Sequence, residues 1–172
     1  LLIDIQEKLV KVMPNNKILI ANIKKMIDAC EIMELKIYLT EQNPDKLGET
    51  ITSIIPNLKY NKYIKSNFSC IECSNLIEDL KNNNIRNILL CGIESHICIL
   101  QSSLDLLANN FNVHIVSDAI QSRKIYDHEI SLIRLRDSGA ILSTTETSIF
   151  ELCKSANHKS FKDISKIIKR SE

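Results

Sequence analysis

The sequence has little of what marks membrane, linker-rich or repeat proteins. It contains only three glycines and three prolines among 172 residues, and its apolar runs are short. Short runs exclude a helix that crosses a bilayer, so we expect no membrane partner. We find no internal repeat, low-complexity segment or linker. One globular domain over residues 1–172 therefore accounts for the length.

The chain also lacks an excess of charge of one sign. Its formal net charge is +1, without a basic block, so neither nucleic acid nor an anionic membrane surface is favoured as a partner. No signal peptide is visible in these residues. The chain begins at Leu1 rather than Met, so the sequence does not exclude a targeting segment ahead of it. We expect a cytoplasmic protein.

The cysteines lack the spacing of a disulfide framework or a metal site. They are Cys30, Cys70, Cys73, Cys91, Cys98 and Cys153. Cys70 and Cys73 form one CxxC pair, but no second CxxC or His pair follows it, which argues against zinc. We therefore expect six reduced thiols, no metal and no cofactor.

Strand and helix patterns alternate along the chain. We expect strands at residues 1–4, 36–40, 60–65, 87–91, 112–116 and 140–143. We expect helices at 16–33, from Ser69 or Ser74 to 82, and at 95–109, 127–137, 146–155 and 159–169, with a polar loop at 41–48. Alternation favours parallel strands, and wholly apolar strands favour a sheet covered on both faces. The fold class is α/β, a three-layer α/β/α domain.

Residues 87–98 are the most informative segment. A buried strand turns at Gly92, and an amphipathic helix begins near Ser95 or His96, so Cys98 lies in the first turn of a helix. The dipole and free N–H groups of a helix start favour a thiolate. Cys98 is therefore either a nucleophile or, as for most free cysteines, a small buried apolar residue.

Two charged residues are expected near Cys98. Asp4 ends the first strand and Lys65 the third, and the carboxyl ends of parallel strands share one edge. The ammonium would lower the pKa of the thiol, and the carboxylate would accept and return its proton. Taken singly, Asp4 is equally a strand-end residue bonded to a loop, and Lys65 a solvated charge.

Several motifs, in order, resemble the isochorismatase-like hydrolase superfamily, in particular its small members without metal-binding histidines. They are D-x-Q at 4–6, T-E-Q-x-P at 40–44 with L-G at 47–48, K-x-x-F-S at 65–69 and G-I-E-S-H-I-C at 92–98. The resemblance implies a Rossmann-like sheet of about six parallel strands and an Asp4–Lys65–Cys98 triad. It also implies a cis peptide near residues 93–94 and homodimers or tetramers.

In the terms of that family, Cys98 attacks an amide-like carbonyl carbon of a small molecule. Backbone N–H groups near Ile97 and Cys98 would hold the oxyanion. Residues 41–48 contain no histidine, which argues against a metal-dependent nicotinamidase. Family members that act on isochorismate lack the cysteine, so Cys98 points to a cysteine hydrolase.

We assign substrate binding to Gln42, Phe68, Glu94 and Ile97. Gln42 is equally a turn residue, Phe68 either walls the pocket or packs, and Glu94 orients the turn. We expect His96 to pack or cap rather than act as a base, and Arg123 to form an internal ion pair.

Two other functions remain open from the residues. The first is a catalytically silent scaffold, whose triad would be inaccessible. The second is a redox protein that uses Cys70 and Cys73.

Overall fold

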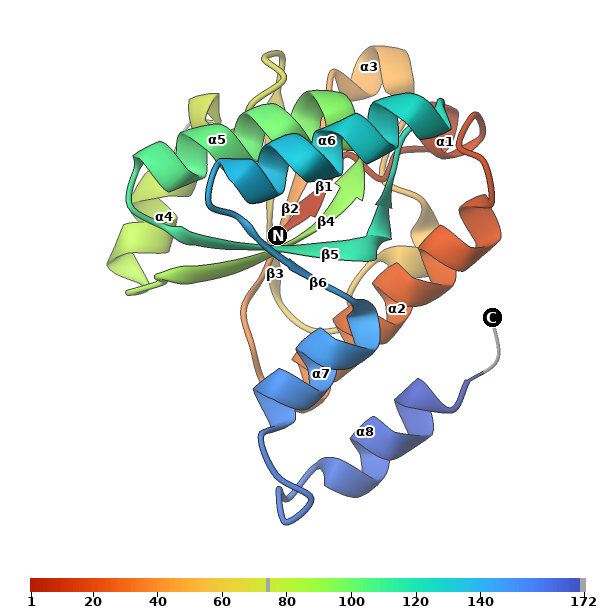
Figure 1. Cartoon of the computed structure of the whole chain (residues 1–172), viewed down its shortest axis with the longest axis vertical. Coiled ribbons are helices and arrows are strands. Elements are labelled where there is room, and N and C mark those ends of the chain that lie inside the picture. Colours follow the sequence, from red (N-terminus) through yellow and green to blue (C-terminus); the bar gives the residue numbers. More distant parts are fainter. Residues whose placement is uncertain (74, 171–172) are drawn as a thin grey trace.

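The computed structural model describes residues 1–73 and 75–170, and a six-stranded sheet forms its centre (Figure 1). The strands are β1 (Leu2–Ile3), β2 (Ile37–Gln42), β3 (Tyr60–Lys65), β4 (Asn87–Ile93), β5 (Asn112–Gln121) and β6 (Ile141–Ser143). Their order is β3-β2-β1-β4-β5-β6, and every neighbouring pair is parallel. The predicted α/β class with six parallel strands is confirmed.

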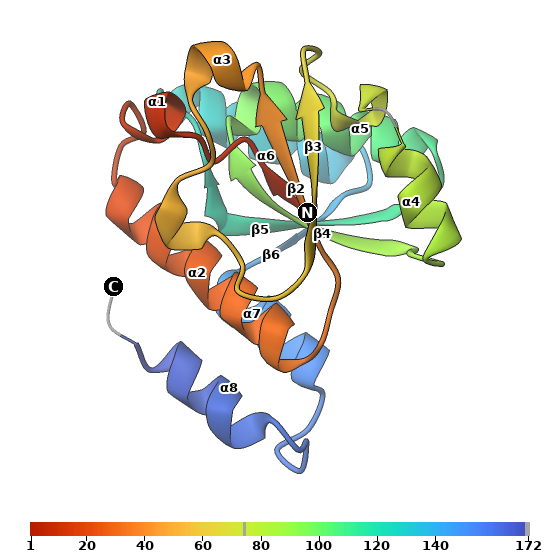
Figure 2. The same cartoon turned by 180° about the vertical axis from the view of Figure 1, so that it is seen from behind.

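Helices cover both faces of the sheet, as Figures 1 and 2 show from opposite sides. The helices are α1 (Glu7–Val10), α2 (Asn16–Ile32), α3 (Pro44–Leu47), α4 (Leu76–Asn82), α5 (Leu100–Ala108), α6 (Ile125–Asp137), α7 (Thr145–Cys153) and α8 (Phe161–Ile168). Helices α4, α5 and α6 pack on one face and α2 and α7 on the other, with α8 against α2 and α7. None of the helices within the described ranges is long and apolar enough to cross a membrane.

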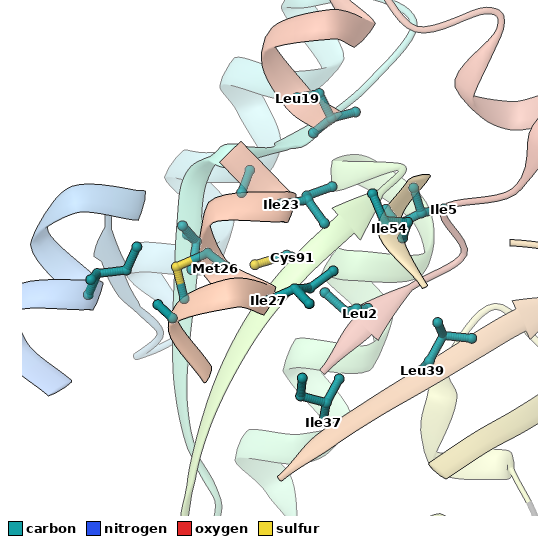
Figure 3. Close-up of a cluster of buried hydrophobic side chains, with 14 of the residues drawn as sticks. Leu2, Ile5, Leu19, Ile23, Met26, Ile27, Ile37, Leu39, Ile54 and Cys91 are labelled. Atoms are coloured by element: carbon teal, nitrogen blue, oxygen red, sulfur yellow. The ribbon is translucent and has the colours of Figure 1, made fainter. Parts of the chain in front are cut away.

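Two apolar cores lie on either side of the sheet because neighbouring strand residues point to opposite faces. Leu2 joins the core under α2, and Ile3 joins the core under α4, α5 and α6. Figure 3 shows the first core, where Ile23 and Ile27 of α2 lie over the strands. Both faces of the central strands β1 and β4 are therefore largely dry, which explains why these two strands are almost wholly apolar, whereas the edge strands β3 and β6 are partly exposed.

The structure corrects several predicted boundaries. Residues 41–48 are not a loop, because β2 continues to Gln42 and α3 follows, with Pro44 in its first turn, where a proline costs nothing. Ser69 caps a short 3-10 turn, Cys70–Glu72, by accepting the N–H of Ile71, whereas Ser74 lies outside the described residues. The helix expected from residue 95 begins as a π-helical turn, Ser95–Ile99, and continues as α5.

The expected turn at Gly92 is wrong, because β4 continues past it to Ile93. Gly92 pairs with Ile3 of β1, and its φ is 138°. A Cβ on Gly92 would lie 2.1 Å from the carbonyl oxygen of Ile3. Glycine is therefore required for β1 and β4 to approach each other here.

Strand β5 is also twice as long as predicted, since it continues to Gln121. Its pairing with β4 shifts, so that Leu90 lies opposite Ile115 but Gly92 lies opposite Ile120. The additional residues form a bulge. Within it, the carboxylate of Asp118 accepts the N–H and the hydroxyl of Thr145, at 2.7 and 2.9 Å, and so anchors the start of α7.

Candidate active site

The three predicted residues meet at the carboxyl edge of the sheet. Asp4 follows β1, Lys65 ends β3, and Cys98 lies in the π-helical turn after β4. The Nζ of Lys65 is 2.6 Å from Oδ2 of Asp4 and 3.5 Å from Sγ of Cys98. The ammonium therefore stands between the carboxylate and the sulfur.

The carboxylate of Asp4 is fully buried and held at both oxygens. The hydroxyl of Thr40 donates to Oδ1 at 2.7 Å, and Lys65 donates to Oδ2. Asp4 also adopts a left-handed backbone with φ of 54°, which aspartate tolerates better than most residues. Its two hydrogen bonds define the direction in which the carboxylate faces.

The ammonium of Lys65 is buried and surrounded by acceptors. Besides Asp4 and Cys98, it donates to Oε1 of Gln42 at 2.7 Å and to the carbonyls of Phe68 and Asn67 at 3.1 and 3.3 Å. A buried charge costs several kcal/mol unless it is paired and hydrogen-bonded, and this shell offsets that cost. The contact with the sulfur is the longest of the five.

The side-chain amide of Gln42 is bonded within the protein, to Lys65 and to the backbone. Its Nε2 donates to the carbonyl of Ser66 at 2.6 Å, so both ends of its amide are occupied. Its backbone N–H donates to Oε1 of Gln6, at 2.7 Å, and Nε2 of Gln6 donates back to the carbonyl of Gln42. Gln42 therefore holds the ammonium in place, whereas the sequence had suggested substrate binding or a turn. The sequence had indicated Gln6 only as the last residue of the D-x-Q motif, with no role of its own.

Replacing Gln42 by methionine is expected to slow acylation of Cys98 by about tenfold or more, because hydrogen bonds to charged groups contribute about 1.5–3 kcal/mol. The measurement is the rate at which 4-nitrophenyl acetate acetylates Cys98. Gln101→Met, on the exposed face of α5, is the matched control and should retain the full rate. Equal rates for both variants would contradict the positioning role.

The thiol of Cys98 differs from the prediction. Cys98 is only 6% exposed, and its pKa is raised to about 12, chiefly by burial and then by the charge of Asp4. The charge of Lys65 lowers the pKa but does not cancel these two effects. The expected lowering of the pKa by the Lys65 ammonium is present, but burial and the charge of Asp4 outweigh it, so the pKa of the resting thiol is raised overall. Cys98 is held as a thiol next to a carboxylate that can take its proton.

The family model described as Isochorismatase domain matches residues 1–147. The chain belongs to the isochorismatase family. Isochorismatase family protein 1A of Dictyostelium discoideum is 43% identical over 148 residues, which cover 82% of this chain and 71% of that protein.

Solved structures show the same isochorismatase-family fold. A structure named MAR1 ribonuclease, from Caenorhabditis elegans, is 32% identical, has a TM-score of 0.93, and is matched over 99% of this chain and 88% of its own. The YcaC gene product of Escherichia coli, called an octameric hydrolase of unknown specificity, has a TM-score of 0.83 at 17% identity, over 97% and 89% of the two chains. At that identity the likeness shows the fold alone.

In this isochorismatase-family chain, Glu94 anchors the turn that carries Cys98. Its buried carboxylate accepts the backbone N–H of Arg123 at 3.0 Å and Nε at 3.0 and 3.1 Å, so the predicted ion pair of Arg123 is present. The carbonyl of Glu94 accepts the N–H groups of Ile97 and Ile99. The N–H of Ile97 thus already donates to the carbonyl of Glu94. To hold an oxyanion as well, this N–H would have to donate to both oxygens.

Two further residues that the sequence predicted near Cys98 are Phe68 and His96. Phe68 is 53% exposed, and its carbonyl accepts a hydrogen bond from Lys65. The Nδ1 of His96 lies 2.9 Å from the hydroxyl of Ser122, so this ring holds the turn against the end of β5, as expected of a packing residue. The cis peptide expected from the family is found between Ile93 and Glu94.

A cavity of about 460 Å³ lies at the opposite edge of the sheet, lined in part by Tyr38, Ile88 and Leu89, and none of the triad residues lines it. Within residues 1–73 and 75–170, no three His, Cys, Asp or Glu side chains gather as a metal-binding group. The six cysteines are free thiols.

Proposed function

We propose that the protein is a cysteine hydrolase that cleaves the C–N bond of a small amide, with Cys98 as the nucleophile. The observation that carries the proposal is the buried ammonium of Lys65, placed within 2.6 Å of the Asp4 carboxylate and 3.5 Å of the Cys98 sulfur. A nucleophile within reach of a base that is itself oriented is the arrangement that covalent catalysis needs.

The chemistry begins with the neutral thiol. As the sulfur of Cys98 bonds to the carbonyl carbon, its proton passes to Asp4 and the carbonyl electron pair moves to oxygen. The C–N bond then breaks, the carbonyl re-forms, and Asp4 returns the proton to the leaving nitrogen. Water attacks the resulting thioester, gives its proton to Asp4, and releases the acid as the sulfur regains a proton.

The test is a panel of small primary amides, with ammonia release as the readout and intact mass as the check for an acyl adduct on Cys98. We expect turnover of at least one amide, and a Cys98→Ala variant that releases no ammonia and forms no adduct. Cys30→Ser, which replaces a partly exposed thiol elsewhere, is the matched control and should remain active. Turnover that survives in Cys98→Ala would overturn the proposal.

A catalytically silent scaffold is the second candidate, and the burial of Cys98 favours it. It predicts that no amide is turned over and that 4-nitrophenyl acetate fails to acetylate Cys98 in the folded protein. The C. elegans structure is named a ribonuclease, but the net charge of +1 does not favour RNA as a ligand of this chain. Cleavage of a labelled RNA by the wild type but not by Cys98→Ala would favour that activity instead.

We also propose a homo-oligomer in a reducing, cytoplasmic setting. The octamer named for the YcaC gene product supports the first statement, and the six free thiols support the second.

A further inference from the structure

The outward face of α6 is apolar where a surface helix is normally charged. Tyr126, Ile130 and Ile133 are spaced at i, i+4 and i+7, so they form one stripe, and they are 69%, 39% and 46% exposed. The opposite face of α6, which packs on the protein, includes Ser131 and the half-buried His128. In Figure 1 the helix lies on the outside of its layer, in front of α5.

Charges flank this apolar stripe in a self-complementary order. On one flank, Asp127 precedes Arg134 by two helical turns, about 10 Å along the axis. On the other flank, Glu129 precedes Arg136 by the same interval. On both flanks the acidic group therefore lies nearer the amino end of α6 and the basic group nearer the carboxyl end. Two of these charges also have neighbours within the chain, since Arg136 pairs with Asp137 at 2.9 Å and Asp127 lies 3.8 Å from Nε2 of His96. A second copy of α6 packed in parallel would oppose like charges, whereas an antiparallel copy would oppose unlike charges.

We infer that α6 is the contact of a two-fold dimer, in which the stripe of Tyr126, Ile130 and Ile133 packs antiparallel against the same stripe of a second copy of this chain. In such an isologous contact, residue i faces residue j and j faces i. With the axis near Ile130, Tyr126 faces Ile133 of the second copy, and Asp127 faces its Arg134. The apolar pair and the charged pair each define a position for the two-fold axis along α6, and these two positions differ by only one residue.

The first test is the mass of the whole chain in solution, measured by light scattering after gel filtration. The wild type should have an even multiple of the 19.6 kDa chain mass, and Ile130→Glu should lose this contact, with a dissociation constant at least about 100-fold higher. Val12→Glu, an exposed apolar residue after α1, is the matched control and should keep the wild-type mass. A monomeric wild type, or an unchanged mass in Ile130→Glu, overturns the inference.

A charge exchange tests the antiparallel register. Asp127→Arg alone places two arginines together at each charged pair, and Arg134→Asp alone places two aspartates there, so each variant should dissociate. An equimolar mixture should regain the wild-type mass, because both pairs are then of opposite sign. A mixture that stays dissociated overturns the register. Acetylation of Cys98, followed in the same samples, reports the proposed catalytic site separately from the contact.

Discussion

Replacing Asp4 by asparagine is expected to slow amide hydrolysis by about 10²- to 10⁴-fold, the usual contribution of a general base, and yet to make Cys98 more easily ionised. The negative charge of Asp4 raises the pKa of Cys98, which stands at about 12, while Lys65 lowers it. Removing that charge therefore moves the pKa of Cys98 downwards. The two readouts are ammonia release and alkylation of Cys98 by iodoacetamide at mildly alkaline pH, which requires the thiolate.

The controls separate charge from folding. Asparagine keeps an oxygen that can accept from Lys65, so the ammonium is not left without a partner at this position. Lys65→Met should act in the opposite direction on the thiol, since it removes the charge that lowers the pKa, and should slow alkylation. Asp45→Asn, on the exposed surface of α3, should change neither readout. Slower alkylation in Asp4→Asn would contradict this electrostatic account of the site.

Gly92→Ala is expected to cost about 4 kcal/mol or more of unfolding free energy, enough to unfold many domains of this size. The new Cβ would lie 2.1 Å from the carbonyl oxygen of Ile3, and that backbone cannot move without separating β1 from β4. The measurement is the urea midpoint followed by circular dichroism. If the variant does not accumulate in folded form, the absence of a cooperative transition is the expected result.

Gly139→Ala is the matched control for this prediction. Gly139 also has a positive φ, of 98°, but a Cβ there would meet no atom within 4 Å. Its cost should therefore be limited to backbone strain, about 1–3 kcal/mol. Similar midpoints for the two variants would show that crowding by β1 is not what requires glycine at position 92.

The sequence predicted the parts of the molecule that depend on local pattern. The period of the apolar residues in α2 and the alternation of strands and helices led to the correct sheet, and the shared edge of parallel strands brought Asp4, Lys65 and Cys98 together. The extension of β5 was missed because Ser117 and Asp118 interrupt its apolar pattern. In the structure these polar side chains bond to Ser143 and Thr145, partners that lie far along the chain.

The electrostatics of the site could not be read from local pattern. A helix start and a nearby ammonium both lower the pKa of a thiol, but burial depends on how the whole chain packs around Cys98, and burial dominates. The contact of Gln42 with Lys65 was missed for a related reason, and Glu94 was expected to orient the turn without its partner Arg123 being known. Each side chain is committed to a partner on another element, Lys65 and Arg123 respectively, which only the folded chain brings into reach.

The pairing of Asp4 with Lys65 keeps the net charge of the site constant through the proposed cycle. At rest, one carboxylate and one ammonium cancel, and the thiol is neutral. When the sulfur attacks, the proton moves to Asp4 and the negative charge moves to the substrate oxygen, so the total stays at zero. It is still zero in the thioester, after the proton has left with the amine. A site whose three residues are this deeply buried can therefore host every step by moving one charge over a short distance, without drawing a counter-ion from solvent.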